Sequence, residues 1–261
     1  MDIVIQGKIF PGTYSTAKYY SKLDFIDKVI ISTWEEEDIE STDKNIIIVK
    51  SPVPYTAPMN LNLQLVSTNA GLDKVTTEKT IKFRSDQMIS KTSMEMLKRF
   101  TDKVGFETDI KYSDGTGPKG HIFAIGMGSY FPYHPQDHVF WGFTEDIKDL
   151  YSCPLYKEDD EITPKLEGGF ETETVRIPCY FGAHYFAKFD PEVYDHIKNF
   201  KDYLVDTSPN RGRAMKISAN LRDKIFKVFP RVDMWWEKYN KGYMYDLYEP
   251  QGEYYYDEEW E

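Results

Sequence analysis

The chain has 261 residues, enough for one large domain, and its 41% hydrophobic and 29% charged residues are ordinary for a globular protein. A formal net charge of −11 disfavours binding to duplex nucleic acid, because such binding depends on Lys and Arg replacing counterions along the phosphate backbone. The charge does not exclude a nucleotide, since a metal ion and a few local donors can hold one or two phosphates.

Cysteine usage and the N-terminus indicate the compartment. Cys153 and Cys179 are far apart in the sequence and show no metal-binding spacing, so we expect two buried thiols in a reducing compartment. Residues 1–10 contain a short apolar run without a preceding basic segment or a cleavage site, which predicts a first strand rather than a signal peptide. No stretch approaches the roughly 20 apolar residues of a membrane helix. We therefore expect a cytoplasmic protein with no membrane span.

The first 104 residues alternate short apolar runs with patterns typical of helices. Within 60–72, the alternation that starts at Asn60 favours a strand, whereas the spacing of Leu61, Leu65 and Leu72 favours a helix. We predict the helix, because buried parallel strands on either side need a crossover connection. The predicted strands cover 3–5, 29–32, 45–49 and 80–83, and the predicted helices cover 14–25, 60–72 and 94–104.

The second half is less regular, and no internal repeat is visible. The chain ends in an aromatic and acidic segment, in which Trp235, Trp236, Tyr243 and Tyr245 have a helical spacing that is typical of a core cluster. An acceptor-binding wall is the alternative for these four residues. The predicted strands of this half cover 122–125 and 140–142, and the predicted helices cover 144–151, 191–204 and 218–228.

The alternation of short apolar strands with helices predicts an α/β fold whose mostly parallel sheet is covered on both faces. In such sheets, ligands bind outside the carboxyl ends of the strands. Polar residues follow three of the apolar runs, at Gln6-Gly7, Ser32-Thr33-Trp34 and Arg84-Ser85-Asp86. The sequence therefore predicts a binding site at this edge of the sheet.

Five segments carry a family resemblance: IVIQGKI at 3–9, ISTWE at 31–35, NLNLQLVSTNAGL at 60–72, KFRSD at 82–86 and HPQDHVFWG at 134–142. They resemble the WavE-type family associated with lipopolysaccharide synthesis, whose members look like glycosyltransferases of the GT-A fold. The resemblance implies a GT-A-like, Rossmann-type mixed sheet, mostly parallel and flanked by helices, with a helical C-terminal part.

The resemblance also implies a single domain over residues 1–261 whose parts have different functions. Residues 1–110 would be the nucleotide-sugar-binding half, and residues 111–233 the acceptor and catalytic half. Residues 234–261 would form an aromatic and acidic extension.

The segment KFRSD lies about where GT-A enzymes carry an acidic metal motif, but the usual Asp-x-Asp appears here as Arg84-Ser85-Asp86, with one carboxylate. Asp86 is the predicted ligand of Mn²⁺ or Mg²⁺, which would bridge diphosphate oxygens. Arg84 is predicted to pair with a phosphate oxygen or to keep Asp86 ionised, and Lys82, on the same side of the strand, to add to that field. A surface salt-bridge row of these three residues is the alternative.

Further residues near the strand ends and at the start of the 60–72 helix are candidates for contacts to the donor. A glycine permits close approach of the backbone, a tryptophan can pack on a base, and amide side chains can donate to the base or sugar. The alternatives are an ordinary turn, a tryptophan that covers the sheet edge and, for Asn60, a helix N-cap. The candidates are Gln6, Gly7, Thr33, Trp34, Asn60, Asn62 and Gln64.

An inverting transferase needs a carboxylate near the acceptor hydroxyl as its base. Asp137, Glu171 and Glu173 are the candidates, and the latter two follow a flexible glycine pair. Simple surface solvation is the alternative for each. Three histidines are candidates for a further metal ligand or phosphate donor, with a structural role as the alternative: His134, His138 and His184.

These features predict a glycosyltransferase that moves a sugar from a UDP- or GDP-linked donor to a glycan or other hydroxyl acceptor in polysaccharide biosynthesis. A sugar nucleotidyltransferase is the first alternative, but residues 6–12 are too poor in Gly and Arg for its signature loop. A non-catalytic module that binds carbohydrate or protein is the second. The incomplete Asp-x-Asp and the acidic tail favour that module, yet it leaves the polar residues at three strand ends unexplained.

Overall fold

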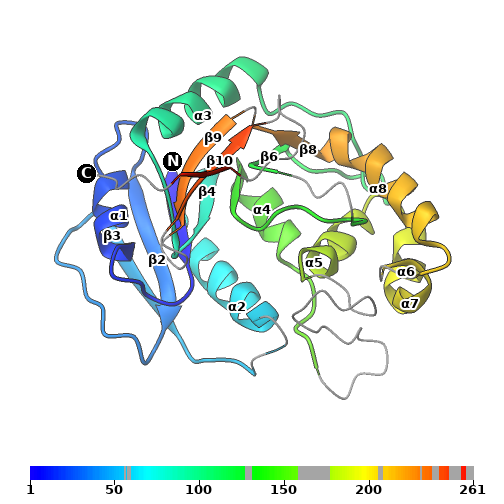
Figure 1. Cartoon of the computed structure of the whole chain (residues 1–261), viewed down its shortest axis with the longest axis horizontal. Helices are drawn as coiled ribbons and strands as arrows, with labels where there is room; N and C mark the ends of the chain where they lie inside the picture. Colours follow the sequence, from blue (N-terminus) through cyan, green and yellow to red (C-terminus); the bar gives the residue numbers. More distant parts are fainter. Residues whose placement is uncertain are drawn as a thin grey trace.

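A computed structural model describes residues 1–55, 57, 60–126, 131–157, 177–204, 208–229, 231–236, 241–246 and 254–256, which form two sheets with flanking helices (Figure 1). The larger sheet has seven strands in the order β3-β2-β1-β4-β7-β6-β8. Every pairing in it is parallel except those of β7, which runs antiparallel to β4 and β6. The mixed, mostly parallel sheet predicted from the sequence is therefore confirmed. Its strands are β1 (Asp2–Gln6), β2 (Lys28–Trp34), β3 (Ile46–Ser51), β4 (Lys79–Arg84), β6 (Ile122–Ala124), β7 (Val139–Phe143) and β8 (Phe226–Val228).

Helices cover both faces of this sheet, and the alternation along β1 shows how the sequence divides them. Ile3 and Ile5 pack in one apolar cluster with α1 and α3, whereas Val4 packs in the other with α2, α4 and α5. Figure 1 places α6, α7 and α8 beyond the β8 end of the sheet. The helices are α1 (Thr13–Tyr20), α2 (Leu61–Leu72), α3 (Lys91–Val104), α4 (Thr144–Leu150), α5 (Ile177–Phe186), α6 (Glu192–Lys198), α7 (Phe200–Tyr203) and α8 (Arg211–Ile225).

Helix α2 confirms the helical interpretation of the ambiguous segment and lies close against the sheet. A Cβ atom at Gly71 would stand 2.5 Å from Val4 Cγ1 and 3.0 Å from Ser32 Cβ, so only glycine permits this approach. Leu61, Leu65 and Leu72 are fully buried on the same face. Close contact with β1 and β2 therefore fixes the helix whose polar residues contribute to the site described below.

The order of the strands produces a switch point between β1 and β4. From β1 the chain proceeds to β2 and β3 on one side of the sheet, and it then returns to form β4 on the other side of β1. Connections that leave in opposite directions open a crevice at the carboxyl ends of the two central strands, where ligands of open α/β sheets bind. Gln6 ends β1 and Arg84 ends β4, so both lie at this point.

The smaller sheet corrects the prediction for the end of the chain. It has the order β11-β10-β9-β5, and β5 follows Asp86 directly in the sequence. Trp235 and Trp236 lie on β9, and Tyr243 and Tyr245 on β10, so the predicted helical spacing of this aromatic cluster is wrong: the backbone there is extended and paired. The four strands are β5 (Gln87–Ile89), β9 (Arg231–Trp236), β10 (Lys241–Asp246) and β11 (Tyr254–Tyr256).

Three predicted helices have different limits in the structure. The segment predicted as one helix over 14–25 is helical only to Tyr20, and the segment over 191–204 is divided at Asn199 into α6 and α7. The helix expected at 218–228 starts at Arg211 and ends at Ile225, because the last three residues pair with β6 as strand β8. The predicted helical character of the second half is confirmed over α5 to α8.

Both cysteines are free thiols, and Cys179 is buried as predicted, whereas Cys153 is partly exposed. Within the described residues, no helix has the length and apolar character needed to cross a membrane.

Candidate functional site

The candidate site lies at the carboxyl ends of β1 and β4, on the face covered by α2. The parallel register pairs Val4 with Lys82 and Gln6 with Arg84, so all four side chains share one face of the sheet. Ile81 and Phe83 alternate with them and pack in the opposite apolar cluster. This pattern confirms that Lys82 and Arg84 lie on the same side of the strand.

The turn after β1 brings the two strand ends together. Gly7 has a φ of +123°, which side-chain-bearing residues rarely adopt, and a Cβ atom on it would stand 2.8 Å from Ser85 Oγ. The Ser85 amide donates to the Gln6 carbonyl at 2.9 Å, and the Gly7 amide donates to the Ser32 carbonyl at 3.0 Å. Glycine is thus required here both for its backbone conformation and for the close approach of Ser85.

Arg84 is the centre of the cluster, because its guanidinium group binds two carboxylates. Nε and NH2 donate to the two oxygens of Asp86 at 3.0 and 2.9 Å, and NH1 donates to Asp137 Oδ2 at 3.1 Å. The side chain of Asp86 is 5% exposed and that of Asp137 17%. The predicted salt bridge between Arg84 and Asp86 is therefore present, but it lies mostly buried at the switch point rather than on an open surface.

These contacts set the protonation of Asp137 and Arg84. Burial alone would raise the pKa of Asp137, but Arg84 and the other basic groups around it, Lys82 among them, together outweigh burial and hold that pKa well below the usual range. Burial likewise acts to lower the pKa of Arg84, whereas Asp137 and Asp86 raise it above its ordinary value. Asp137 is therefore ionised and Arg84 protonated at any physiological pH.

Lys82 lies beneath this cluster and is fully buried. Its Nζ donates to the backbone carbonyl of Asp137 at 2.7 Å and lies 5.3 Å from the centre of the Tyr151 ring and 5.9 Å from that of Phe140. Burial lowers the pKa of Lys82 to about 7, with Asp137 opposing that effect. Lys82 thus fixes the segment before β7 to β4.

Helix α2 contributes two polar contacts. Gln64 Nε2 donates to Asp137 Oδ2 at 2.9 Å, and Ser67 Oγ donates to Gln6 Oε1 at 2.7 Å. The predicted candidates Gln6 and Gln64 therefore belong to the cluster. Asn60 is exposed at the N-terminus of α2, has a φ of 65° and makes no capping hydrogen bond with its side chain. Asn60 therefore occupies the N-cap position of α2, but its side chain does not form the hydrogen bond of an N-cap.

The side chain of Asn62 has a structural role instead of the predicted contact to the donor. Its Nδ2 donates to the carbonyls of Tyr55 and Tyr156 at 3.1 and 2.9 Å, and its Oδ1 accepts from the Tyr156 amide at 2.7 Å. The two bonds with Tyr156 join α2 to the segment after α4, and all three bonds together leave the amide group little capacity for a ligand.

The end of β2 contributes less to the cluster than the sequence predicted. Thr33 is fully buried and follows Ser32, whose partner in the register is Gln6, so strand alternation places Thr33 on the opposite face from Gln6 and Arg84. Trp34 is 6% exposed, which agrees with the alternative that it covers the sheet edge. The structure therefore does not bring Thr33 to the cluster.

One of the three predicted histidines lies beside the cluster. His138 Nδ1 is 2.6 Å from Gln87 Nε2, on the strand that follows Asp86, and burial lowers the pKa of His138 to about 4, so the ring is neutral near pH 7. His134 packs on the ring of Phe131 and His184 on that of Tyr180. These contacts fit the structural alternative for His134 and His184.

Of the three residues predicted as the catalytic base, the structure describes Asp137 alone. Glu171 and Glu173 lie outside the described residues. Asp137 lies in the cluster, but an ionised carboxylate with a strongly lowered pKa is a weak base. The base role of Asp137 stays a prediction, and its contacts with Arg84 and Gln64 favour a role in positioning.

A divalent ion needs oxygen ligands, and the pair Asp86 and Asp137 supplies them. Within the described parts of the chain, no group of three or more His, Cys, Asp or Glu side chains is arranged to hold an ion by itself. Mg²⁺ in phosphate-binding sites usually takes only one or two carboxylates and completes its shell with phosphates and water. Because both carboxylates converge on the single cation Arg84, their arrangement fits an ion of this kind.

The sequence did not reveal the partners of Arg84 beyond Asp86. The local sequence pattern does not indicate that Asp137 contacts Arg84, or that Ser67 and Gln87 lie beside the cluster. The apolar run over 139–141 predicts a strand at β7, but the pairing of β7 with β4 is not readable from that run.

Several solved structures are similar to this chain. S. aureus TarS residues 1–349 is 14% identical with a TM-score of 0.41, and the match covers 84% of this chain and 70% of TarS 1–349; the same protein has been solved with UDP. Galactosyltransferase LgtC, with donor and acceptor sugar analogues, is 12% identical with a TM-score of 0.34 and coverages of 57% and 59%. A putative glucose-1-phosphate thymidylyltransferase from Bacillus anthracis is 10% identical with a TM-score of 0.35 and coverages of 59% and 75%.

Among curated proteins, none has a sequence that matches this chain. A family model described as WavE lipopolysaccharide synthesis matches residues 25–175, which is more than half of the chain and includes α2, β4 and the segment around Asp137. The chain belongs to the WavE lipopolysaccharide synthesis family.

Proposed function

We propose that the protein is a glycosyltransferase that moves a sugar from a nucleotide-sugar donor to a hydroxyl group of a glycan or similar acceptor. The family supports a role in polysaccharide synthesis. The observation that carries the proposal is the cluster of Arg84, Asp86 and Asp137 at the switch point of the sheet. Ligands of such sheets bind there, and the Arg84 guanidinium is a donor that can pair with a phosphate oxygen.

In this proposal the diphosphate of the donor lies at the ends of β1 and β4. Gly7 itself presents only backbone at that edge, which permits near approach of a nucleotide. Arg84 donates to the diphosphate as the bond to the sugar breaks, and Lys82 and Gln64 hold Asp137 in place. A bound Mn²⁺ or Mg²⁺ would supply further neutralisation of the leaving diphosphate, and Asp86 and Asp137 would hold it.

The acceptor hydroxyl must lose a proton as it attacks, and an inverting enzyme uses a carboxylate for this step. Asp137 is bound by Arg84, so Glu171 and Glu173 are the better candidates for the base in this proposal. A cytoplasmic location belongs to the same proposal, with two free thiols as its support.

A thermal-shift screen of nucleoside diphosphates and nucleotide-sugars, with and without Mn²⁺, tests the function. A ligand at 100 times its Kd stabilises the folded state by about 2.7 kcal/mol, so one class of nucleotide is expected to raise the Tm by several degrees. In Asp86→Ala, the Mn²⁺ dependence of that shift is expected to disappear.

The donor identified in this way is then expected to be hydrolysed slowly in the absence of an acceptor. Consumption of a nucleoside triphosphate together with a sugar phosphate would instead indicate a nucleotidyltransferase. No shift with any nucleotide would contradict the proposal and favour a binding module.

A further inference from the structure

The geometry around Arg84 is that of a cation shared between two carboxylates from distant parts of the chain. Asp86 follows β4 and Asp137 precedes β7, and each accepts from the same guanidinium group within 3.1 Å. Asp86 is almost completely buried and Asp137 largely so. The one carboxylate of the Arg84-Ser85-Asp86 segment therefore has a second carboxylate beside it in space, which the sequence motif does not show.

Without the guanidinium, this pair would be unstable. Two carboxylates close together and mostly withdrawn from water repel each other, and such a pair must take up either a proton or a cation. Arg84 now fulfils that requirement. A divalent ion fulfils it equally well, because Mg²⁺ and Mn²⁺ combine one or two carboxylates with phosphate oxygens.

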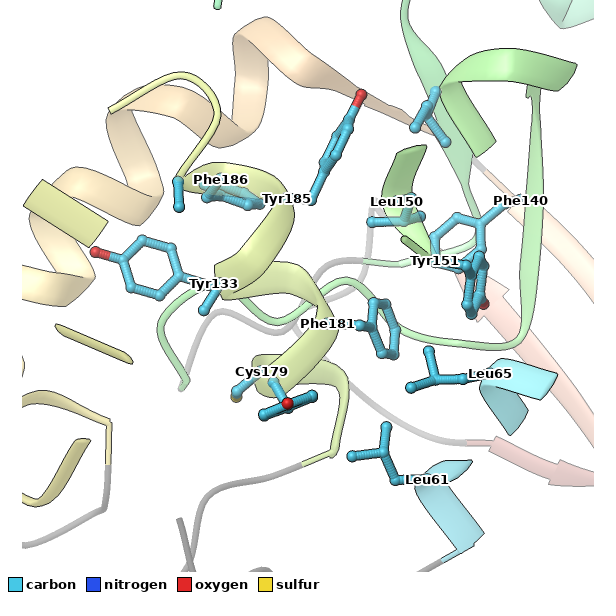
Figure 2. Packing of buried hydrophobic residues seen from close by; sticks show 14 of the residues in the cluster. Leu61, Leu65, Tyr133, Phe140, Leu150, Tyr151, Cys179, Phe181, Tyr185 and Phe186 are labelled. Carbon is cyan, nitrogen blue, oxygen red and sulfur yellow. The ribbon is translucent and has the colours of Figure 1, made fainter. Parts of the chain in front are cut away.

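A second, independent feature points to a polar ligand at the same place. Tyr151 is fully buried, and within the described residues its hydroxyl makes no hydrogen bond of good geometry, although the Gln64 amide lies near enough to act on it. Figure 2 shows its ring beside Phe140 on the apolar face that α2 covers, and Asp137 and Arg84 are the charged groups that act on its hydroxyl. A buried hydroxyl that lacks an acceptor is costly, and an anionic ligand oxygen would satisfy it.

We propose that Arg84 occupies the position of a divalent cation between Asp86 and Asp137, and that it turns to the diphosphate when the nucleotide and the metal bind together. This inference rests on the proposed function for the identity of the anion. The exchange conserves the local charge balance, because the metal replaces the guanidinium between the carboxylates while the guanidinium pairs with phosphate. Before the donor arrives, Arg84 then prevents the site from taking up a cation.

The alternative is a permanent brace, in which Arg84 holds Asp86 and Asp137 in the same way with and without ligand. The two roles differ in what happens when the guanidinium is removed. A site that Arg84 occupies in place of a metal becomes a metal site after its removal, whereas a brace leaves only a weakened fold.

Binding of Mn²⁺ alone separates the two roles, measured by the loss of the free Mn²⁺ signal in electron paramagnetic resonance. Arg84→Gln is expected to bind Mn²⁺ at least tenfold more tightly than the unaltered protein, because its two carboxylates lose the one cation that contacts both of them. Arg84→Lys, which keeps the charge, is the matched control and is expected to remain as weak as the unaltered protein. Adding Asp137→Asn to Arg84→Gln is expected to abolish the gain.

If Arg84→Gln is only marginally folded, its Tm provides the same test. Mn²⁺ is then expected to raise the Tm of Arg84→Gln, relative to EDTA, by more than it raises that of the unaltered protein. Equal Mn²⁺ affinity in both proteins, or a gain that survives Asp137→Asn, would overturn the inference. None of these measurements uses a nucleotide or a turnover, so their failure is distinct from failure of the proposed transferase activity.

Discussion

Asp137→Ala is expected to lower kcat/KM for the nucleotide-sugar by about 100-fold or more, which is the typical cost of removing one group that orients charge in an active site. The substitution removes a carboxylate from Arg84 and the acceptor of Gln64. Arg84 then has Asp86 as its remaining carboxylate among these contacts and loses its fixed direction. The measurement is steady-state hydrolysis or transfer with the donor that the thermal-shift screen identifies.

Asp73→Ala is the matched control for this substitution. Asp73 also contacts a basic side chain, Lys148, but its side chain is 72% exposed and lies at the other end of α2 from Gln64. Surface ion pairs of this kind contribute little, so activity and Tm are expected to be unchanged. An Asp137→Ala variant as active as Asp73→Ala would show that the cluster at the switch point is not where the reaction occurs.

Gly182→Ala is expected to destabilise the protein by about 3 kcal/mol or more, or to prevent folding, because helix α5 lies directly against the segment that leads to Asp137. A Cβ atom at Gly182 would overlap the backbone carbonyl of Tyr133 and stand 2.7 Å from Pro135 Cδ. Neither group is the flexible end of a side chain, so the helix and the segment must separate. Urea unfolding followed by circular dichroism measures the effect.

Gly212→Ala is the matched control, because the same substitution at this position is expected not to destabilise the protein. Gly212 lies in the first turn of α8, and nothing lies within 4 Å of the Cβ atom that alanine would add. Alanine is favoured over glycine in helices by up to about 1 kcal/mol, so this variant is expected to be as stable as the unaltered protein or slightly more so. A Gly182→Ala protein with unchanged unfolding would contradict the close packing of α5 described above.

The parts of the fold that the sequence predicts are those with local signals. The β-branched runs of β1 to β4 and the spacing of Leu61, Leu65 and Leu72 define the first half, and the polar residues after these strands indicate the correct edge of the sheet. The same local pattern also indicates on which face of the sheet Thr33 lies. Counting alternately from Ile31, which packs in the α1 and α3 cluster, already places Thr33 away from the site.

The rest depends on pairings between distant residues, which the local sequence pattern does not specify. Arg84 and Asp137 are 53 residues apart, and they meet only because β7 pairs with β4 in an antiparallel register. The extended conformation of the C-terminal segment also depends on a distant partner, because β9 pairs with β5, which lies far away in the sequence. Mixed aromatic and polar segments of this kind have no strong period of their own, so the partner strand decides their conformation.

A cavity elsewhere in the structure offers a different place for a ligand to bind. A cavity of about 540 Å³ is lined by residues that include Glu107, His121, Asp223 and Lys227. It lies where β6 and β8 begin, and β6 runs in the same direction as β4, so this cavity is at the opposite edge of the sheet from Arg84.

Hydrogen–deuterium exchange with the stabilising nucleoside diphosphate distinguishes the two edges directly. We expect slower exchange at the amides of Gly7 and of residues 85–87, and little change around His121 and Lys227. Protection confined to the cavity residues, with residues 7 and 85–87 unchanged, would contradict the assignment of the nucleotide to the ends of β1 and β4.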